Sequence, residues 1–191
     1  MARTLSADVR AALDGAVDEL VYARGWHTVT LDDICERAGV GKPALYRHLG
    51  SRDDVLFDYL TRRRERRMRE LEATVDAAGA VPRARIDAVV GFYARWIASD
   101  DFVGCGFHRA LLQRSPEHGR VAALTSAYKA ELLAVLRREL RPLGAAALAA
   151  ADVLFLLIEG AMAVGAYDDR AGTAQRLRTA AGAVLHARCA P

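Results

Sequence analysis

This chain of 191 residues has few of the residues and motifs that build strands, cross-links or catalytic sites. Runs of β-branched residues are scarce, and alanine, leucine and arginine dominate, which favours an all-helical fold. The three cysteines are widely spaced, without the pairing of a disulfide framework or a metal site. The five histidines are dispersed, and no GxSxG, HExxH or CxxC pattern occurs. The sequence therefore predicts no enzyme, no metal and no other cofactor.

The sequence also carries little net charge, and we expect no targeting segment. The net charge is only +3, which is too small to indicate nucleic-acid binding by itself. Arg3 and Asp8 interrupt the N-terminal segment, so we expect no signal peptide. The most apolar stretch, residues 143–167, contains Asp152 and Glu159, which favours a buried helix over a membrane span. We expect a globular cytoplasmic protein with no membrane partner.

The spacing of apolar residues predicts about nine helices. Gly25 ends the first helix, Pro82 separates the fourth from the fifth, and Pro142 and Gly144 end the seventh. The expected ranges are residues 6–24, two short helices within 30–49, then 52–78, 86–98, 107–113, 116–140, 146–166 and 171–188.

Residues 30–49 predict two short helices that meet at a sharp corner. Thr30 followed three residues later by Asp33 is typical of a capping box at a helix start. Gly39 provides the left-handed backbone that ends the first helix. Pro43 fits the start of the second, because the N–H groups of a first turn are unpaired anyway. This arrangement is typical of a helix-turn-helix whose second helix enters the major groove of DNA.

The second of these helices carries most of the residues that we expect to contact DNA. Residues 37–52 contain four arginines or lysines and no acid, and such cations neutralise phosphates. Arg47 is the candidate base reader, because an arginine that binds guanine through two hydrogen bonds is the commonest direct readout. Tyr46 and His48 either face solvent or contact phosphates, and Thr30 either only caps its helix or also meets a phosphate. The predicted DNA-binding residues are Thr30, Lys42, Pro43, Ala44, Tyr46, Arg47, His48 and Arg52.

These residues resemble the DNA-binding segment of the TetR (tetracycline-repressor-like) family over about fifty positions. Gly41 departs from the family pattern, which often has a serine cap there, and Leu49 replaces a frequent aromatic residue. A weaker resemblance reaches one type of C-terminal ligand domain of that family. Besides residues 30–49, the similar segments are residues 13–20, 25–30 and 50–56, and more weakly 103–107 and 159–162.

The resemblance implies an all-α protein with a three-helix helix-turn-helix DNA-binding head in residues 1–51. A long fourth helix then opens a larger ligand-binding and dimerisation domain in residues 52–191. The implied function is a homodimeric repressor that leaves its double-stranded operator when a small hydrophobic or amphipathic effector binds. Two other interpretations stay open: a DNA-binding regulator without a natural small-molecule ligand, and a helical enzyme or carrier. The basic run of residues 37–52 argues against the last.

Aromatic residues concentrate in the second half of the chain. They either fill a core or line a mostly apolar cavity with a few polar groups, the usual form of a ligand site. A glutamate within an apolar helix must be paired, protonated or turned toward a cavity. Glu159 is therefore either a ligand contact or one half of a structural pair, for instance with an arginine. The predicted ligand-binding residues are Phe92, Trp96, Phe107, His108, Tyr128, Phe155 and Glu159.

The last two helices carry the predicted dimer interface. Residues 153–166 are almost entirely apolar, and a helix that is apolar all round must be covered on both sides. Small residues within it allow a second subunit to approach closely. The predicted interface residues are Val153, Leu157, Gly160, Ala161, Val164, Gly165, Leu177, Ala181, Val184 and Leu185.

Residues 62–69 hold six arginines in eight positions. On a helix these side chains point around the whole circumference, so some of them must face the protein. Three interpretations stay open: a solvated face, long-range attraction of DNA, or ion pairs with the carboxylates of a neighbouring helix.

Overall fold

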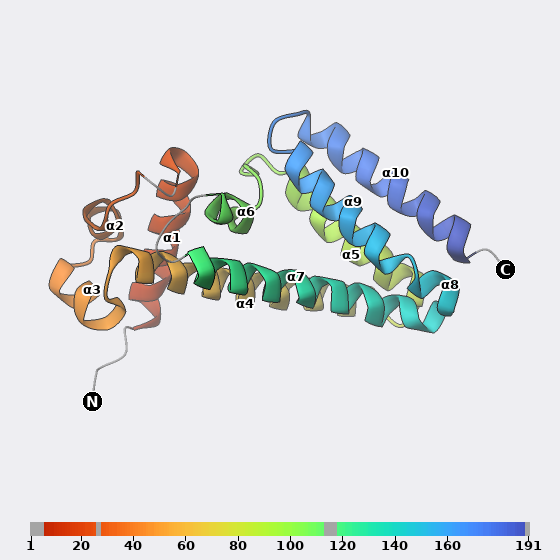
Figure 1. The fold of residues 1–191 in the computed structure, drawn as a ribbon, viewed down its shortest axis with the longest axis horizontal. Helices are drawn as coiled ribbons and strands as arrows, with labels where there is room; N and C mark the ends of the chain where they lie inside the picture. The colour runs from red at the N-terminus through yellow and green to blue at the C-terminus, as the bar shows by residue number, and fades with distance from the viewer. Residues whose placement is uncertain (1–5, 26–27, 113–117, 190–191) are drawn as a thin grey trace. The chain divides into compact units, whose positions relative to one another are not determined.

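The computed structural model describes residues 6–25, 28–112 and 118–189, and every regular element in these ranges is helical (Figure 1). The predicted all-α fold is confirmed. The elements are α1 (Ala7–Arg24), α2 (Leu31–Ala38), α3 (Lys42–Leu49), α4 (Arg52–Ala77), α5 (Pro82–Ala98), α6 (Gly106–Leu111), α7 (His118–Leu140), the 3₁₀ turn η1 (Arg141–Leu143), α8 (Ala145–Leu148), α9 (Ala151–Val164) and α10 (Arg170–Cys189).

Two helix boundaries differ from the sequence prediction for identifiable reasons. Pro82 lies in the first turn of α5 instead of before the helix, because a missing N–H costs nothing at that position. The stretch expected as one helix over 146–166 is divided into α8 and α9. There the Ala150 N–H donates to the Ala147 carbonyl, three residues back instead of four. The predicted start of the seventh helix at residue 116 lies outside the described residues.

The chain forms two compact units. The first comprises residues 1–65 and 106–125, and the second comprises residues 66–105 and 126–191. The division therefore falls within α4 and within α7, whereas the sequence placed it between residues 51 and 52. The assignment of functions to the two parts stays a prediction.

The first unit has a core in which α1 packs against α2, and α2 against α3 (Figure 1). The buried side chains of this core come from the inward faces of its helices, as the apolar spacing predicted, together with Val29 from the segment between α1 and α2. Those at most 1% exposed include Leu13, Val17, Val29, Ile34, Leu45, Val55 and Leu60.

Two arginines of α4 fasten that helix to α1. The Nε atom of Arg62 lies 3.0 Å from each carboxylate oxygen of Asp14. Arg63 pairs with Asp18, and its Nη1 lies 2.8 Å from the Tyr59 hydroxyl. For these two arginines the third interpretation of the cluster, ion pairs with a neighbouring helix, is the observed one. Removing one partner of such a covered pair leaves an uncompensated charge, which is strongly destabilising.

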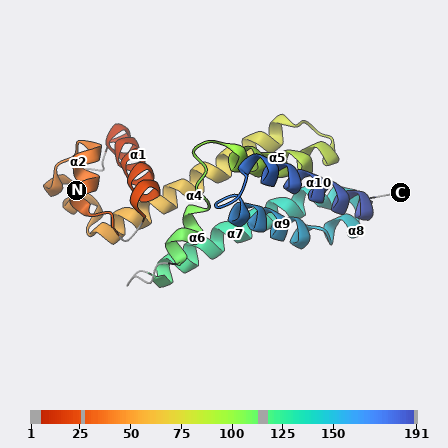
Figure 2. The same cartoon turned by 90° about the horizontal axis from the view of Figure 1, so that it is seen from above.

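The second unit packs α5, α9 and α10 side by side (Figure 2). A buried carboxylate links α5 to α7, because the Arg85 Nε donates to Glu139 over 2.6 Å and the Arg138 Nε donates to it over 2.7 Å. Burial alone would raise the pKa of Glu139, but the hydrogen bonds and positive charges of the two arginines together outweigh burial, so its pKa is lowered. The carboxylate therefore stays ionised inside the unit.

One helical stretch of the described residues, Ala145–Val164, is long and apolar enough to cross a membrane by length and composition. Core helices of other proteins have the same properties, and the inner face of α9, including Leu154, Ile158 and Met162, is buried. The opposite side, here called the α9 outer face, is exposed although it is apolar. It consists of Val153, Leu156, Gly160 and Ala163.

Gly165, at the end of α9, allows the closest packing of this helix. A Cβ atom there would lie 2.7 Å from Ile97 Cγ2 and 3.2 Å from Phe102 Cε1. We expect Gly165→Ala to lower the free energy of unfolding by about 1–3 kcal/mol, because an added methyl overpacks this contact. Chemical denaturation monitored by circular dichroism measures the change.

Gly15→Ala is the matched control, because nothing lies within 4 Å of the corresponding position in α1. Alanine is the better helix former, so this control should leave stability unchanged or raise it by about 0.5–1 kcal/mol. Equal stability of the two variants would contradict the tight contact at Gly165.

Candidate functional site

The corner between α2 and α3 has the geometry that the sequence predicted. The Thr30 Oγ1 accepts from the Asp33 N–H over 3.1 Å, and the Asp33 carboxylate accepts from the Thr30 N–H over 2.8 Å. The hydrogen bonds from Thr30 lower the pKa of Asp33, so the cap stays charged. At the other end, Gly39 has φ 67°, and the Val40 N–H donates to the Cys35 carbonyl over 3.0 Å. This bond belongs to a Schellman motif, which ends α2 and sets the direction of α3.

One side of α3 is anchored and the other faces solvent. Leu45 is fully buried, whereas Lys42, Pro43 and Tyr46 are exposed. Tyr46 keeps 56% of its surface open, although it is a large aromatic residue. Gly41 caps the helix without a side-chain hydrogen bond. The side chains of Ala44, Arg47 and His48 lie outside the described part of the structure, so their predicted roles stay predictions.

Two of the predicted phosphate contacts already have intramolecular partners. The Lys42 Nζ lies 2.5 Å from an Asp32 carboxylate oxygen, and this hydrogen bond raises the pKa of Lys42. Arg52 donates to the Val29 carbonyl and forms an ion pair with Asp53. These contacts orient both cations, but an incoming phosphate has to compete for Lys42. Sequence reasoning missed Asp32 because its partner lies ten residues away across the corner.

The start of α4, directly after α3, is held by a shared carboxylate. Asp54 accepts from the Ser51 N–H over 3.0 Å and from the Ser51 hydroxyl over 2.7 Å, so the two residues cap the start of this helix. Its other oxygen accepts from Arg120 Nη1 of α7 over 2.9 Å. The Arg120 guanidinium also lies 4.1 Å from the centroid of the Phe57 ring. Hydrogen bonds from Arg120 and Ser51 lower the pKa of Asp54 to about 2.

The predicted ligand residues divide between the two units. Phe107 is buried and His108 is half-buried, both on α6 of the first unit. The others belong to the second unit, where Phe92 and Tyr128 are buried and Trp96 and Phe155 are half-buried.

Close aromatic contacts occupy the interior of the second unit. The Trp96 and Phe102 rings pack edge to face with centroids 5.0 Å apart. The hydroxyls of Tyr93 and Tyr128 lie 3.4 Å apart. Burial and the adjacent Tyr128 hold the pKa of Tyr93 well above its ordinary value, so its hydroxyl stays neutral.

Glu159 has a structural partner, and the partner is a lysine instead of an arginine. The Lys129 Nζ of α7 lies 2.7 Å from Glu159 Oε1, and the two side chains are 12% and 14% exposed. The same ammonium lies 3.7 Å from the Cys105 Sγ, a buried thiol. Whether Glu159 also contacts a ligand stays a prediction.

Arg67, one of the six arginines in residues 62–69, lies in an aromatic environment. Its guanidinium carbon is 4.4 Å from the ring centroids of both Phe92 and Trp96. The Nη1 atom donates to Glu70 over 3.0 Å. The Nε and Nη2 atoms are buried and have no hydrogen-bond partner in the described structure. Phe92 and Trp96 are one helical turn apart on α5, which was the available signal that they share a neighbour.

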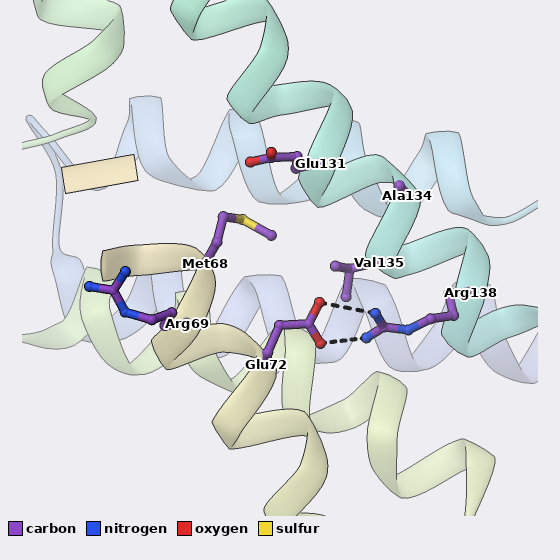
Figure 3. A pocket seen from close by; sticks show the side chains of 7 residues that line it. All are labelled: Met68, Arg69, Glu72, Glu131, Ala134, Val135 and Arg138. Carbon is purple, nitrogen blue, oxygen red and sulfur yellow. Dashed lines mark hydrogen bonds and ion pairs between the residues drawn. The ribbon is translucent and has the colours of Figure 1, made fainter. Parts of the chain in front are cut away.

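A groove of about 560 Å³ lies between α4 and α7 of the second unit (Figure 3). Arg138 closes part of its rim by donating to both carboxylate oxygens of Glu72, over 3.0 Å and 2.6 Å. Apolar side chains beside charged ones could hold an amphipathic molecule. Sequence reasoning missed this groove because neither helix forms it alone. Its lining consists of Met68, Arg69, Glu72, Glu131, Ala134, Val135 and Arg138. In the described ranges, no three His, Cys, Asp or Glu side chains are grouped to hold a metal ion.

The predicted dimer residues differ in their exposure within one subunit. Val153 and Gly160 are exposed, and Gly165 is buried against its own subunit. Half-buried residues are Leu157, Ala161, Val164 and Val184, and buried ones are Leu177, Ala181 and Leu185. Sequence reasoning missed Leu156, which is 67% exposed and shares the helical spacing of Val153 and Gly160. The interface itself stays a prediction.

Residues 13–59 match the family described as "Bacterial regulatory proteins, tetR family". This segment contains α2, α3, the corner between them and the start of α4. The family match therefore covers the part of the chain whose geometry follows most directly from its sequence.

Similar proteins extend the likeness to the rest of the chain. The HTH-type transcriptional regulator AlkX of Mycobacterium tuberculosis is 24% identical over 135 residues, 71% of this chain. Those residues make up 56% of AlkX, so this chain spans little more than half the length of that curated relative. SCO4454, a TetR-family transcriptional regulator from Streptomyces coelicolor, has a solved structure with a TM-score of 0.78 and 28% identity. That match covers 96% of this chain and 91% of SCO4454.

The TetR family regulator CifR, solved with a 26-base-pair double-strand operator DNA, is also similar. Its TM-score is 0.67 at 22% identity, covering 97% of this chain and 98% of that one. At this identity the likeness shows the shared fold alone.

The carboxylate shared by Ser51 and Arg120 gives a pH prediction. Because the pKa of Asp54 is about 2 in the folded protein and 3.8 ordinarily, its contribution to stability is present above pH 3.8 and is lost as the pH falls toward 2. We expect Arg120→Ala to raise the pKa of Asp54 toward 3.8, measured by carboxyl NMR during an acid titration. Arg83→Ala, which removes another arginine paired with an aspartate, should leave that pKa unchanged. An unchanged pKa in Arg120→Ala would contradict the contact.

Proposed function

We propose that this chain is a TetR-family DNA-binding regulator of transcription that acts in the cytoplasm, because residues 13–59 match that family and the TetR-family regulator SCO4454 is similar over almost the whole chain. The observation that carries the proposal is the α2–α3 corner, where a capping box and a left-handed glycine direct α3 outward. The exposed side of α3 presents Lys42 and Tyr46, and the chain continues with Arg47 and His48. This helix would enter the major groove of an operator, with arginine or lysine side chains on phosphates and base edges.

The regulation would be repression relieved by a small hydrophobic or amphipathic molecule. Aromatic contacts, a buried ion pair and a groove in the second unit support a role in binding such a molecule. An effector can release DNA only by binding the released conformation more tightly than the DNA-bound one. The link would run through α4, which begins directly after α3 and extends into the second unit.

The regulator would act as a homodimer formed through the α9 outer face. An apolar helix face open to solvent is unfavourable, and a second copy of the same helix is a self-complementary cover. Gly160 and Ala163 are small enough for two helices to approach closely. Two-fold symmetry would also place two α3 helices about one turn of DNA apart, as a palindromic operator requires.

Selection of duplexes from a random pool, followed by salt titration, tests DNA binding. We expect Arg47→Ala to weaken binding to the selected duplex by about 1–3 kcal/mol and to relax the preference at one base pair. Asp32→Asn should have the opposite sign and bind about two- to fivefold tighter at low salt, because it frees Lys42 and removes a negative charge.

Asp152→Asn is the matched control, since Asp152 is an exposed carboxylate paired with Arg137 on the second unit. Failure to select any duplex would refute the proposed function. Parent-like binding by both Arg47→Ala and Asp32→Asn would instead exclude α3 as the reading helix.

Gly160→Arg tests the dimer. Nothing lies within 4 Å of the position of a Cβ at Gly160 in the subunit, so the substitution should leave the fold intact while blocking close approach of a partner. We expect sedimentation to show a monomer, with operator affinity lost together with the dimer. Ala77→Arg, at an exposed position of α4, should remain dimeric. A parent protein that sediments as a monomer at micromolar concentration would contradict this interface.

A further inference from the structure

The guanidinium of Arg67 has an incomplete set of hydrogen bonds. Its Nε and Nη2 atoms are shielded from solvent and meet no acceptor among the residues that the structure describes. A buried donor without a partner is costly, more so on a charged group, and native proteins seldom keep one without a use for it. Lys129, another buried cation of this unit, is by contrast paired with Glu159 over 2.7 Å.

The two unpaired atoms form one functional edge. Nε–H and one Nη2–H point in parallel along the same side of the planar guanidinium, which is the side that binds a carboxylate through two hydrogen bonds. The remaining nitrogen, Nη1, is turned toward Glu70, whose side chain is 45% exposed. Arg67 therefore directs Nη1 to Glu70 near the surface and keeps Nε and Nη2, the two donors of this edge, inside the unit.

Two aromatic rings hold this edge in place. The Phe92 and Trp96 centroids each lie 4.4 Å from the guanidinium carbon, which is the contact of a cation with a ring face. Phe92 in turn packs edge to face against Tyr93, which is fully buried. An acceptor that reaches Arg67 would meet a fixed cation in apolar surroundings.

We propose that the Nε–Nη2 edge of Arg67 binds the carboxylate of a small organic acid with an apolar body, and that such an acid is the effector. The proposal rests on the proposed function, since it assigns the chemical class of the regulatory ligand. A monoanionic carboxylate suits this edge better than phosphate, because a second negative charge would have to lose its water among aromatic side chains.

The burial of Nε and Nη2 explains how binding of the acid is linked to a change of conformation. Because neither nitrogen is open to solvent, the carboxylate enters only when the side chains over Arg67 move apart. The ligand therefore binds one conformation more tightly than the other, which is the requirement for a shift of populations. Arg67 lies on α4, the helix that begins directly after α3, so the change arises on the element that leads to the DNA-reading helix.

Trp96 is a built-in reporter, because its ring contacts Arg67. In a full-length Trp26→Phe background, Trp96 is the remaining tryptophan of the chain. Phenylacetate and decanoate are titrated against phenylacetamide, decanamide and inorganic phosphate, following Trp96 fluorescence and the thermal midpoint. We expect a saturable response and a raised midpoint with at least one carboxylate, and affinity at least about tenfold weaker for its amide and for phosphate.

Arg67→Gln removes the charge and the paired donors, and Arg67→Lys keeps the charge but not the two-donor edge. Both should lose the carboxylate response by about tenfold or more, while circular dichroism confirms that they are folded. Arg83→Gln changes the net charge equally at an exposed position of the same unit, outside the groove, and should respond like the parent.

Three results of the titration would overturn the proposal. They are equal responses to acid and amide, a carboxylate response that persists in Arg67→Gln, and no response to either carboxylate.

The same acids are then added to the protein bound to a duplex selected from a random pool. Release by the acid that binds Arg67 supports its role as effector, and binding without release overturns it. Failure to select any duplex counts against the proposed function and leaves the fluorescence result for the Arg67 site standing.

Discussion

A guanidinium that leaves water must find its hydrogen bonds inside the protein, and α4 is built around this constraint. Arg62 and Arg63 satisfy it with Asp14 and Asp18 of α1, so the angle of α4 in the first unit is set by ion pairs as well as by apolar packing. One turn further along, Arg67 satisfies it only in part. The helix thus has a segment fixed by ion pairs and, next to it, a segment whose arginine has two buried donors without an acceptor.

Local signals were enough to predict the helix-turn-helix. The capping box joins Thr30 to Asp33 within one turn, and Gly39 acts through its own backbone, so neither depends on the rest of the fold. The pairs of Lys42 with Asp32 and of Lys129 with Glu159 depend instead on how helices pack. A sequence pattern shows that a buried glutamate needs a partner, but only the packed structure selects a lysine thirty residues away.

The same limit applies to α9. Its composition predicted an apolar helix that needs cover on both sides. In the structure, the side that faces its own subunit is covered. The sequence could not show which side of α9 would face its own subunit, because a helix that is apolar all round carries little directional signal. The packing of α5 and α10 decides it. Gly165 was therefore expected to face a second subunit and instead packs on Ile97, while Leu156 was overlooked and is exposed.

The carboxylate of Asp32 beside Lys42 has a consequence for how such a protein would search a genome. An acid attached to the same chain competes for the lysine at a high and constant effective concentration, whereas DNA phosphates arrive from outside. Random DNA offers only phosphates, so each encounter would be brief and the protein would soon move on. A sequence that adds base contacts would hold it longer. The ion pair would thereby shorten the time spent on every site, wrong ones included, and leave base contacts with a larger share of the binding free energy on the right one.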